Sequence, residues 1–276
     1  MRRRRLWLVS LTMIVTAAPS YGSESSDSAE PIPNHPILSK KLVFTLGIFY
    51  PRNTTSASLY PSAGGVGTDV NFENALDLDK RNIVPTLGVF WRVSDNWRVE
   101  AEYFKISRDG TRVTAEEVTW GDLTFNVGTT VNSSFDFSDL RISGAYSFFK
   151  RKDKELGVGL GLHVAGIKTQ VQAASVGSDS TNVTAPLPVL NVYGMFALTN
   201  TWAVTLRSDW LSLTYGDYTG DVRNIEINAL YQPFKNVGFG VGVRSLLIDV
   251  DISNTDWTGQ AQVDFQGPDA FMTISF

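Results

Sequence analysis

The stretch that decides the fold is TLGVFWRVSDNWRVEAEYF, residues 86–104. Apolar residues alternate with small or charged ones on both sides of a short polar turn at 94–96. Successive side chains of a β-strand point to opposite faces, so this alternation predicts two strands that each have one apolar face. The short turn between them predicts an antiparallel hairpin.

The same unit recurs three more times, at 142–162, 192–210 and 225–243. The short turns are predicted at 94–96, 150–154, 199–201 and 233–236. Longer polar segments separate the hairpins, at 51–82, 109–133, 173–186, 216–221 and 251–259. Short turns and long loops in this alternation connect ten strands. Eight or twelve strands remain open, because 67–78 could be a spanning strand rather than part of one outer loop. Otherwise segment 67–78, and the paired segments 112–120 and 123–131, could extend as hairpins above the membrane.

Connections sorted by length are typical of transmembrane barrels, in which the turns on one side of the membrane are short and the outward loops are long. The sequence therefore predicts an all-β fold, a transmembrane antiparallel up-and-down β-barrel of about ten strands, over residues 41–276. A soluble sandwich could show the same alternation within its strands, but it has no reason to sort its connections in this way.

One predicted face of the strands carries no charged residue, and the opposite face carries many. Placing arginine on a lipid-facing position near the bilayer centre costs about 2–4 kcal/mol, so the charged face must point into the lumen. The predicted lumen-lining charged network is Arg92, Arg98, Glu100, Glu102, Asp139, Arg141, His163, Arg207, Asp209, Glu226 and Arg244.

Five arginines and five carboxylates make up this set, together with one histidine. Buried charges need partners, so a closed ion-pair network is one interpretation. A polar lining for a narrow, porin-like solute path is the other. Two glycine runs, 157–161 and 238–242, share the inward face and are interpreted as room for large neighbours, with a passage as the alternative.

The first 22 residues predict a signal peptide, because four arginines precede an apolar run too short to span a bilayer as a helix. Its removal would leave 20 basic and 28 acidic residues, a formal charge of −8, which argues against a nucleic-acid partner. Residues 23–40 are rich in Ser, Pro and acidic residues and predict a disordered periplasmic leader.

The chain ends in AFMTISF, which resembles the C-terminal signal recognised by the barrel-assembly machinery, with Phe276 as its last residue. Region 41–276 as a whole resembles the small monomeric outer-membrane barrels of Gram-negative bacteria, the broad OmpA-like and OmpW-like group. That resemblance implies a location in the outer membrane and contact with its lipid and lipopolysaccharide. It does not imply one activity, because such families include anchors, narrow channels, enzymes and adhesins.

The function predicted is therefore a non-enzymatic barrel, structural or narrow-pore, with surface-exposed loops and with small solutes as an open possibility. A lipid A acyl hydrolase or transferase is the main alternative, and a surface adhesin is another. Such an enzyme needs an activated oxygen beside a histidine, but the alternate neighbours of His163 are Gly161 and Ala165. No catalytic residue, metal site or cofactor is predicted.

Overall fold

The computed structural model describes residues 32–59, 69–120, 122–253 and 258–276. The chain divides into residues 1–31 and a second unit, residues 32–276, which holds the fold. The predicted signal peptide and the first part of the predicted leader lie outside the described residues. In the described part, no helix is long and apolar enough to cross a membrane.

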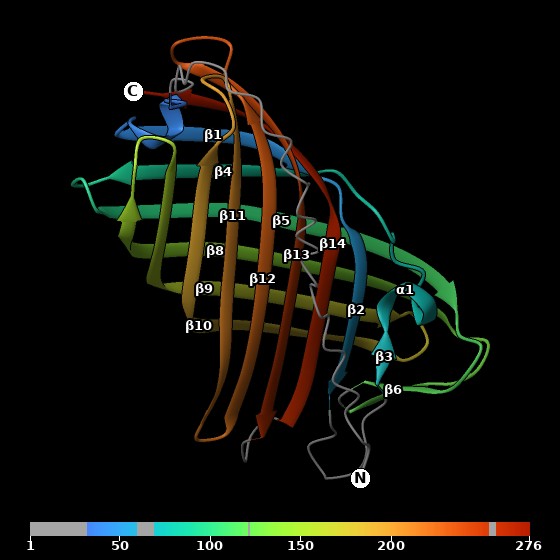
Figure 1. The fold of residues 1–276 in the computed structure, drawn as a ribbon. Helices are drawn as coiled ribbons and strands as arrows, with labels where there is room; N and C mark the ends of the chain where they lie inside the picture. Colours follow the sequence, from blue (N-terminus) through green and yellow to red (C-terminus); the bar gives the residue numbers. More distant parts are fainter. Residues whose placement is uncertain (1–31, 60–68, 121, 254–257) are drawn as a thin grey trace, which may run out of the picture. The chain divides into compact units, whose positions relative to one another are not determined.

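Ten antiparallel strands close into a barrel (Figure 1). Each strand pairs with its neighbour along the chain, and the last returns to the first, from Val43 opposite Ser275 to Phe49 opposite Asp269. The ten strands are β1 (Leu42–Phe49), β4 (Val84–Arg92), β5 (Trp97–Val113), β8 (Thr130–Lys150), β9 (Lys154–Ala173), β10 (Gly177–Ala197), β11 (Trp202–Tyr215), β12 (Tyr218–Tyr231), β13 (Val237–Ser253) and β14 (Thr258–Ser275).

The predicted outer loop 51–82 adds no spanning strand within its described residues, so the count of ten stands. Strand β2 (Arg52–Leu59) pairs with the part of β14 that lies beyond its pairing with β1, so β2 extends the same edge of β14. The chain passes close to Gly267 here, where a Cβ atom would lie 2.2 Å from the carbonyl oxygen of Tyr50.

The end of this loop turns inward instead of extending outward. Strand β3 (Val70–Asn71) leads into a short helix, α1 (Phe72–Ala75). The side chains of Phe72 and Leu76 are fully buried. Apolar burial explains the difference from the predicted outward hairpin at 67–78, since these side chains gain more by filling the barrel mouth than by facing water.

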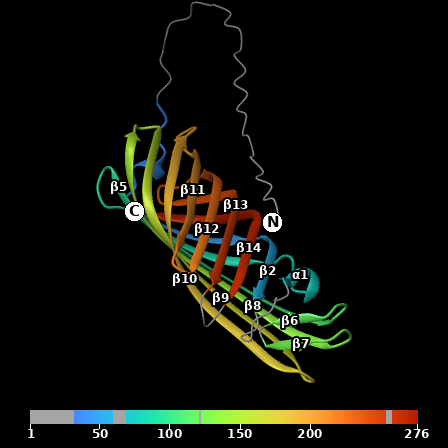
Figure 2. The same ribbon diagram turned by 90° about the horizontal axis from the view of Figure 1, so that it is seen from below.

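The other predicted long loops are mostly strand. Strands β9 and β10 continue to a turn at 174–176, so most of segment 173–186 is a paired ladder. Between β5 and β8, β6 (Val118–Trp120) and β7 (Leu123–Phe125) form the separate hairpin that the sequence left open. Figure 2 shows β8, β9 and β10 running past the ends of β11–β14. Strands can also be formed by mostly polar residues, so polar composition alone wrongly predicted loops in these segments.

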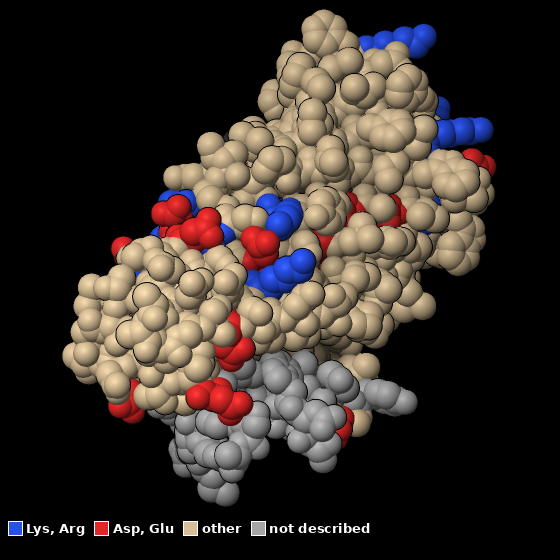
Figure 3. Space-filling model, turned by 180° about the vertical axis from the view of Figure 1, so that it is seen from behind, with Lys and Arg blue, Asp and Glu red and all other residues tan. Residues whose placement is uncertain are grey.

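The outer surface carries a belt of exposed apolar residues at the positions predicted to face lipid, among them Leu87, Trp97, Leu160 and Phe239. On β5 the belt ends at Tyr103, because the next outward residue is Lys105, which lies 3.0 Å from Asp136. Figure 3 shows a face where most charged side chains gather in two groups with a mainly uncharged area between them.

One seam of the barrel is paired over only part of its length. The ladder between β10 and β11 ends at Leu190 opposite Trp210, although β10 stays paired with β9 as far as Gly177. Beyond that point β10 and β11 diverge (Figure 1). Pro186 and Pro188 lie on β10 directly after the pairing ends.

Residues 32–40 are ordered, which corrects part of the predicted disordered leader. Pro36–Leu38 form a 3₁₀ helix, η1. Ile37 and Leu38 are buried against Phe90, Met195 and other apolar residues at the short-turn end of the lumen. The composition of the leader predicted disorder, but Ile37, Leu38 and His35 are buried in the docked segment.

His35 is fully buried just before η1. Its Nδ1 accepts a hydrogen bond from the Ile37 amide, and its Nε2 lies 3.2 Å from the carbonyl oxygen of Thr201, to which it donates. This pairing requires a neutral ring. Burial lowers the pKa of His35 below its usual value, against the smaller opposing effect of the Thr201 carbonyl.

Candidate functional site

The charged residues predicted to face inward all lie inside the barrel, on strands β4, β5, β8, β9, β11, β12 and β13. The strand period of two explains why they share one side of the wall. All five arginines are less than a tenth exposed. Each of the eleven residues takes part in at least one ion pair.

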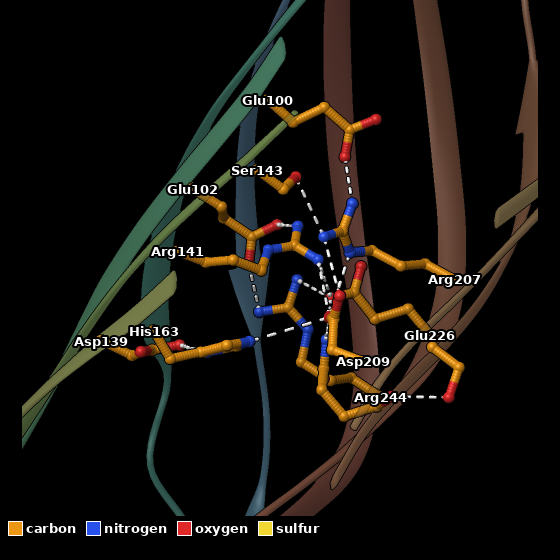
Figure 4. Close-up of polar contacts among 12 residues, drawn as sticks. Glu100, Glu102, Asp139, Arg141, Ser143, His163, Arg207, Asp209, Glu226 and Arg244 are labelled. Carbon is orange, nitrogen blue, oxygen red and sulfur yellow. Dashed lines mark hydrogen bonds and ion pairs between the residues drawn. The ribbon is translucent and has the colours of Figure 1, made fainter. Parts of the chain in front are cut away.

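Asp209 on β11 is the centre of the network (Figure 4). Arg207 donates to both of its carboxylate oxygens, over 3.1 and 2.8 Å. Arg141 lies 3.4 Å away and the Asn224 amide 2.8 Å away, both at Oδ2. A carboxylate with no solvent exposure needs this number of donors, because burial of an unpaired charge is very costly.

Two further carboxylates link the arginines across the lumen. Arg141 pairs with Glu102 at 3.2 Å and with Glu226 at 3.3 Å. Arg244 on the opposite wall pairs with the same two groups, at 2.5 and 3.5 Å. Glu100 joins Arg207 to Arg98, the latter at 2.8 Å. The contacts cross from β5 to β13, so the network ties distant strands together.

His163 lies at the edge of this network. Its Nδ1 is 2.9 Å from Asp139 Oδ2, and its Nε2 is 3.8 Å from Asp209 Oδ2. The ring is 1% exposed. The hydroxyl of Ser143 accepts from Arg207 over 3.1 Å, which places it in the arginine network. The ring therefore lies between two carboxylates, and within the described part of the chain it makes no hydrogen bond to a hydroxyl group.

The structure adds two carboxylates that the sequence analysis did not include, Glu155 and Asp269. Glu155 is fully buried and takes two hydrogen bonds from Arg92, at 2.9 and 2.8 Å. Ser147 also donates to it and accepts from the hydroxyl of Tyr193. The alternation that placed Leu156 and Ala270 outward could have placed both neighbours inward.

The inward glycines make room for large side chains. A Cβ atom on Gly157 would lie 2.2 Å from the Tyr193 ring, and one on Gly240 would lie 2.1 Å from Phe271. On Gly242 it would meet Asn228 at 1.8 Å. These runs therefore serve packing in the narrow lumen. The backbone there is covered by neighbouring side chains.

Aromatic rings fill the lumen on the long-strand side of the network. Phe49, Phe104, Phe137 and Phe265 are buried, and their ring centres follow one another at 6.3, 5.9 and 5.0 Å. The guanidinium of Arg244 lies 5.4 Å from the Phe49 ring, so the aromatic layer borders the charges directly. Beyond it, Arg108 and Glu73 form another buried ion pair.

Between the network and η1 lies a cavity of about 160 Å³. Four arginines and four carboxylates contribute to its wall, and Ile37 of the N-terminal segment closes part of it. The charged wall residues are Arg98, Glu100, Glu102, Arg141, Arg207, Glu226, Arg244 and Asp269.

No protein-family model matches the chain, and no curated protein matches it in sequence. Several solved structures resemble it in fold. The outer membrane protease OmpT from Escherichia coli is similar with a TM-score of 0.57 and 11% identity, over 86% of this chain and 97% of that chain. The translocator domain of the autotransporter NalP from Neisseria meningitidis is similar with a TM-score of 0.46 and 10% identity, over 86% of this chain and 89% of that chain. Ail of Yersinia pestis is similar with a TM-score of 0.38 and 8% identity, over 84% of this chain and 99% of that chain.

Of these three, only OmpT has a TM-score above one half, and its low identity supports the fold alone. The match covers almost the whole length of OmpT. The barrel of the present chain is closed by antiparallel pairing of its last strand with its first. The chain has the fold of the small outer-membrane β-barrels of Gram-negative bacteria.

Proposed function

We propose that the protein is a sealed, non-enzymatic barrel of the Gram-negative outer membrane that anchors its long hairpins at the cell surface. The observation that carries the proposal is the filling of the lumen by three successive layers. These are the docked segment η1, the ion-pair network, and the aromatic residues around Phe137.

The outer belt supports the membrane location. It is formed by exposed apolar side chains such as Leu46, Leu87 and Val241, and aromatic residues lie at its two borders, as at Trp97 and Tyr103. In water so large an apolar surface would drive association. Phe276 at the end of β14 fits the predicted role of an assembly signal, and the barrel-assembly machinery is the partner that this role requires.

The ion-pair network favours a sealed lumen and argues against an open pore. A selectivity lining needs side chains that exchange partners with passing ions. Here each arginine already holds one or more carboxylates, and Asp209 holds two arginines and Asn224. Moving an ion through this region would break several buried pairs at once, at about 3–5 kcal/mol for each uncompensated charge.

The surroundings of His163 support a non-enzymatic role. A hydrolase needs a base that substrate can reach and a nucleophile within hydrogen-bond distance of it. His163 is 1% exposed, and both of its nitrogens face carboxylates. OmpT is described as a protease, but a shared fold at 11% identity brings no activity with it.

Recording from the refolded protein in planar bilayers tests the seal. We expect no reproducible unitary currents from the full chain. A variant that lacks residues 32–40 should still conduct nothing, because the aromatic layer stays in place. Steady single-channel currents from the full chain would overturn the proposal. Mass spectrometry of lipid A from cells with and without the protein tests the absence of acyl-transfer chemistry, and a changed acyl pattern would refute it.

A further inference from the structure

The charges inside the barrel do not balance. The described inward residues of the network include five arginines, Arg92, Arg98, Arg141, Arg207 and Arg244. They face seven carboxylates, Glu100, Glu102, Asp139, Glu155, Asp209, Glu226 and Asp269. A positive charge on His163, which lies between Asp139 and Asp209, would reduce the excess to one negative charge.

The remaining negative charge can be assigned to Asp269. Every other carboxylate of the set forms an ion pair with arginine or histidine. Among the described residues no such pair is formed by Asp269. Its Oδ1 is buried without a hydrogen-bond partner, and its Oδ2 lies 3.3 Å from the Asn228 amide nitrogen when that nitrogen faces it.

Asp269 also borders the cavity of about 160 Å³, which is far larger than the ~10–15 Å³ that one water molecule needs. Phe271, two residues further along the same face of β14, lines the same cavity. A carboxylate without an ion-pair partner and an aromatic ring beside it form a site for a cation that has both a charge and an apolar part.

We propose that this cavity binds one small monovalent cation of the ammonium type, held by the carboxylate of Asp269 with its apolar part against Phe271. One free carboxylate matches one positive charge. A divalent ion would need several oxygen ligands, about six to eight for calcium. The aromatic layer closes one end, so the ligand must enter from the side of η1.

The test uses the full chain, refolded in detergent at fixed ionic strength and pH with the cation present, so that access does not limit binding. The probes are methylammonium and potassium. At ten times its dissociation constant, methylammonium should raise the thermal unfolding midpoint by about 3–6 °C. The Asp269→Asn variant should show no such rise, and without added cation its midpoint should equal or exceed that of the natural chain.

Asp264→Asn is the matched control, because Asp264 lies on the outward side of the same strand and hydrogen-bonds Gln266. It should respond to methylammonium as the natural chain does. The same rise in Asp269→Asn, or an equal rise with potassium, would overturn the assignment. A nuclear Overhauser contact between the methylammonium methyl group and the Phe271 ring provides a readout that needs no variant, and its absence at saturating ligand would also overturn it. Bilayer currents test the seal and not this site, so the two proposals can fail separately.

Discussion

The two halves of the lumen are filled by opposite kinds of chemistry. Toward the short turns the interior holds the network of arginines and carboxylates, with the apolar residues around η1 at its end. Toward the long strands phenylalanine and aliphatic side chains dominate, with one buried ion pair, Arg108 with Glu73, among them. Both fillings close the same narrow barrel. The apolar half is held by packing, so we expect it to accept one large apolar residue in place of another. The polar half is held by specific partners, and each of its members depends on the others.

The largest effect should follow from loss of the central carboxylate. Asp209→Ala leaves Arg207 and Arg141 buried without their shared partner, so unfolding in urea should cost about 3–5 kcal/mol less than in the natural chain. The control Asp264→Ala should change the unfolding free energy by no more than about 0.5 kcal/mol. A small effect of Asp209→Ala would mean that the polar half is as tolerant as the apolar half.

A second test separates the two sides of the wall within the polar half. Gly159→Ala places a methyl group 2.3 Å from the carbonyl oxygen of Gly144, and backbone cannot move aside cheaply. We expect a loss of about 1–3 kcal/mol. Gly144→Ala on the neighbouring strand should be nearly neutral, since no atom lies within 4 Å of the new Cβ. Equal losses in urea unfolding would contradict the inward and outward assignment.

The apolar half should accept a change of shape. Phe137→Met keeps a large apolar side chain in the aromatic layer, so the loss in unfolding free energy should stay below about 1.5 kcal/mol. Bilayer recordings should remain silent. If this conservative change costs as much as Asp209→Ala, the ring contacts of Phe137 with Phe104 and Phe265 are as specific as the ion pairs.

The smallest effect should be local and dependent on pH. The pKa of His35 is lower in the docked segment than in a free chain, so protons favour the undocked form. Docking should be complete above the usual histidine pKa of about 6.5 and should weaken as the pH falls below it. The measurement is hydrogen exchange at the Ile37 amide, which donates a hydrogen bond to the His35 ring.

His35→Gln is the control, because its side chain does not titrate in this range. Exchange at Ile37 should then be faster at every pH and should no longer change between pH 5 and 8 beyond the intrinsic chemistry of the amide. If exchange at Ile37 in the natural chain is equally independent of pH, His35 does not control docking. The barrel as a whole should be unaffected, since the segment contacts only its short-turn end.

The barrel could be predicted from the sequence because its main signal is local. Alternation over a few residues placed Leu87, Trp97 and Phe239 outward, and the structure confirms the closed ten-strand fold. The same rule could have found Glu155 and Asp269, which were missed because their strands were read only for the apolar face. The fold therefore needed little more than a period of two.

The pairing inside the lumen could not be predicted in this way. Arg92 meets Glu155, 63 residues away, and Arg207 meets Glu100 across the barrel. Such contacts depend on strand tilt and on the stagger of the ladder, which no short segment encodes. The inward turn of Phe72 was missed for a related reason, since its burial depends on a mouth that exists only once the barrel has closed.

The partly open seam beside β10 has a consequence for solubility outside the membrane. Along β10, Ala197 donates its amide toward β9 and Leu198 donates toward β11, so every second residue faces the seam. Pro186 and Pro188 share the register of Leu198 and have no amide hydrogen to offer there. An exposed strand edge invites other chains to add to it. With two consecutive donors missing where the ladder ends, this edge is a poor template, and the protein can leave a seam unpaired without inviting self-association through it.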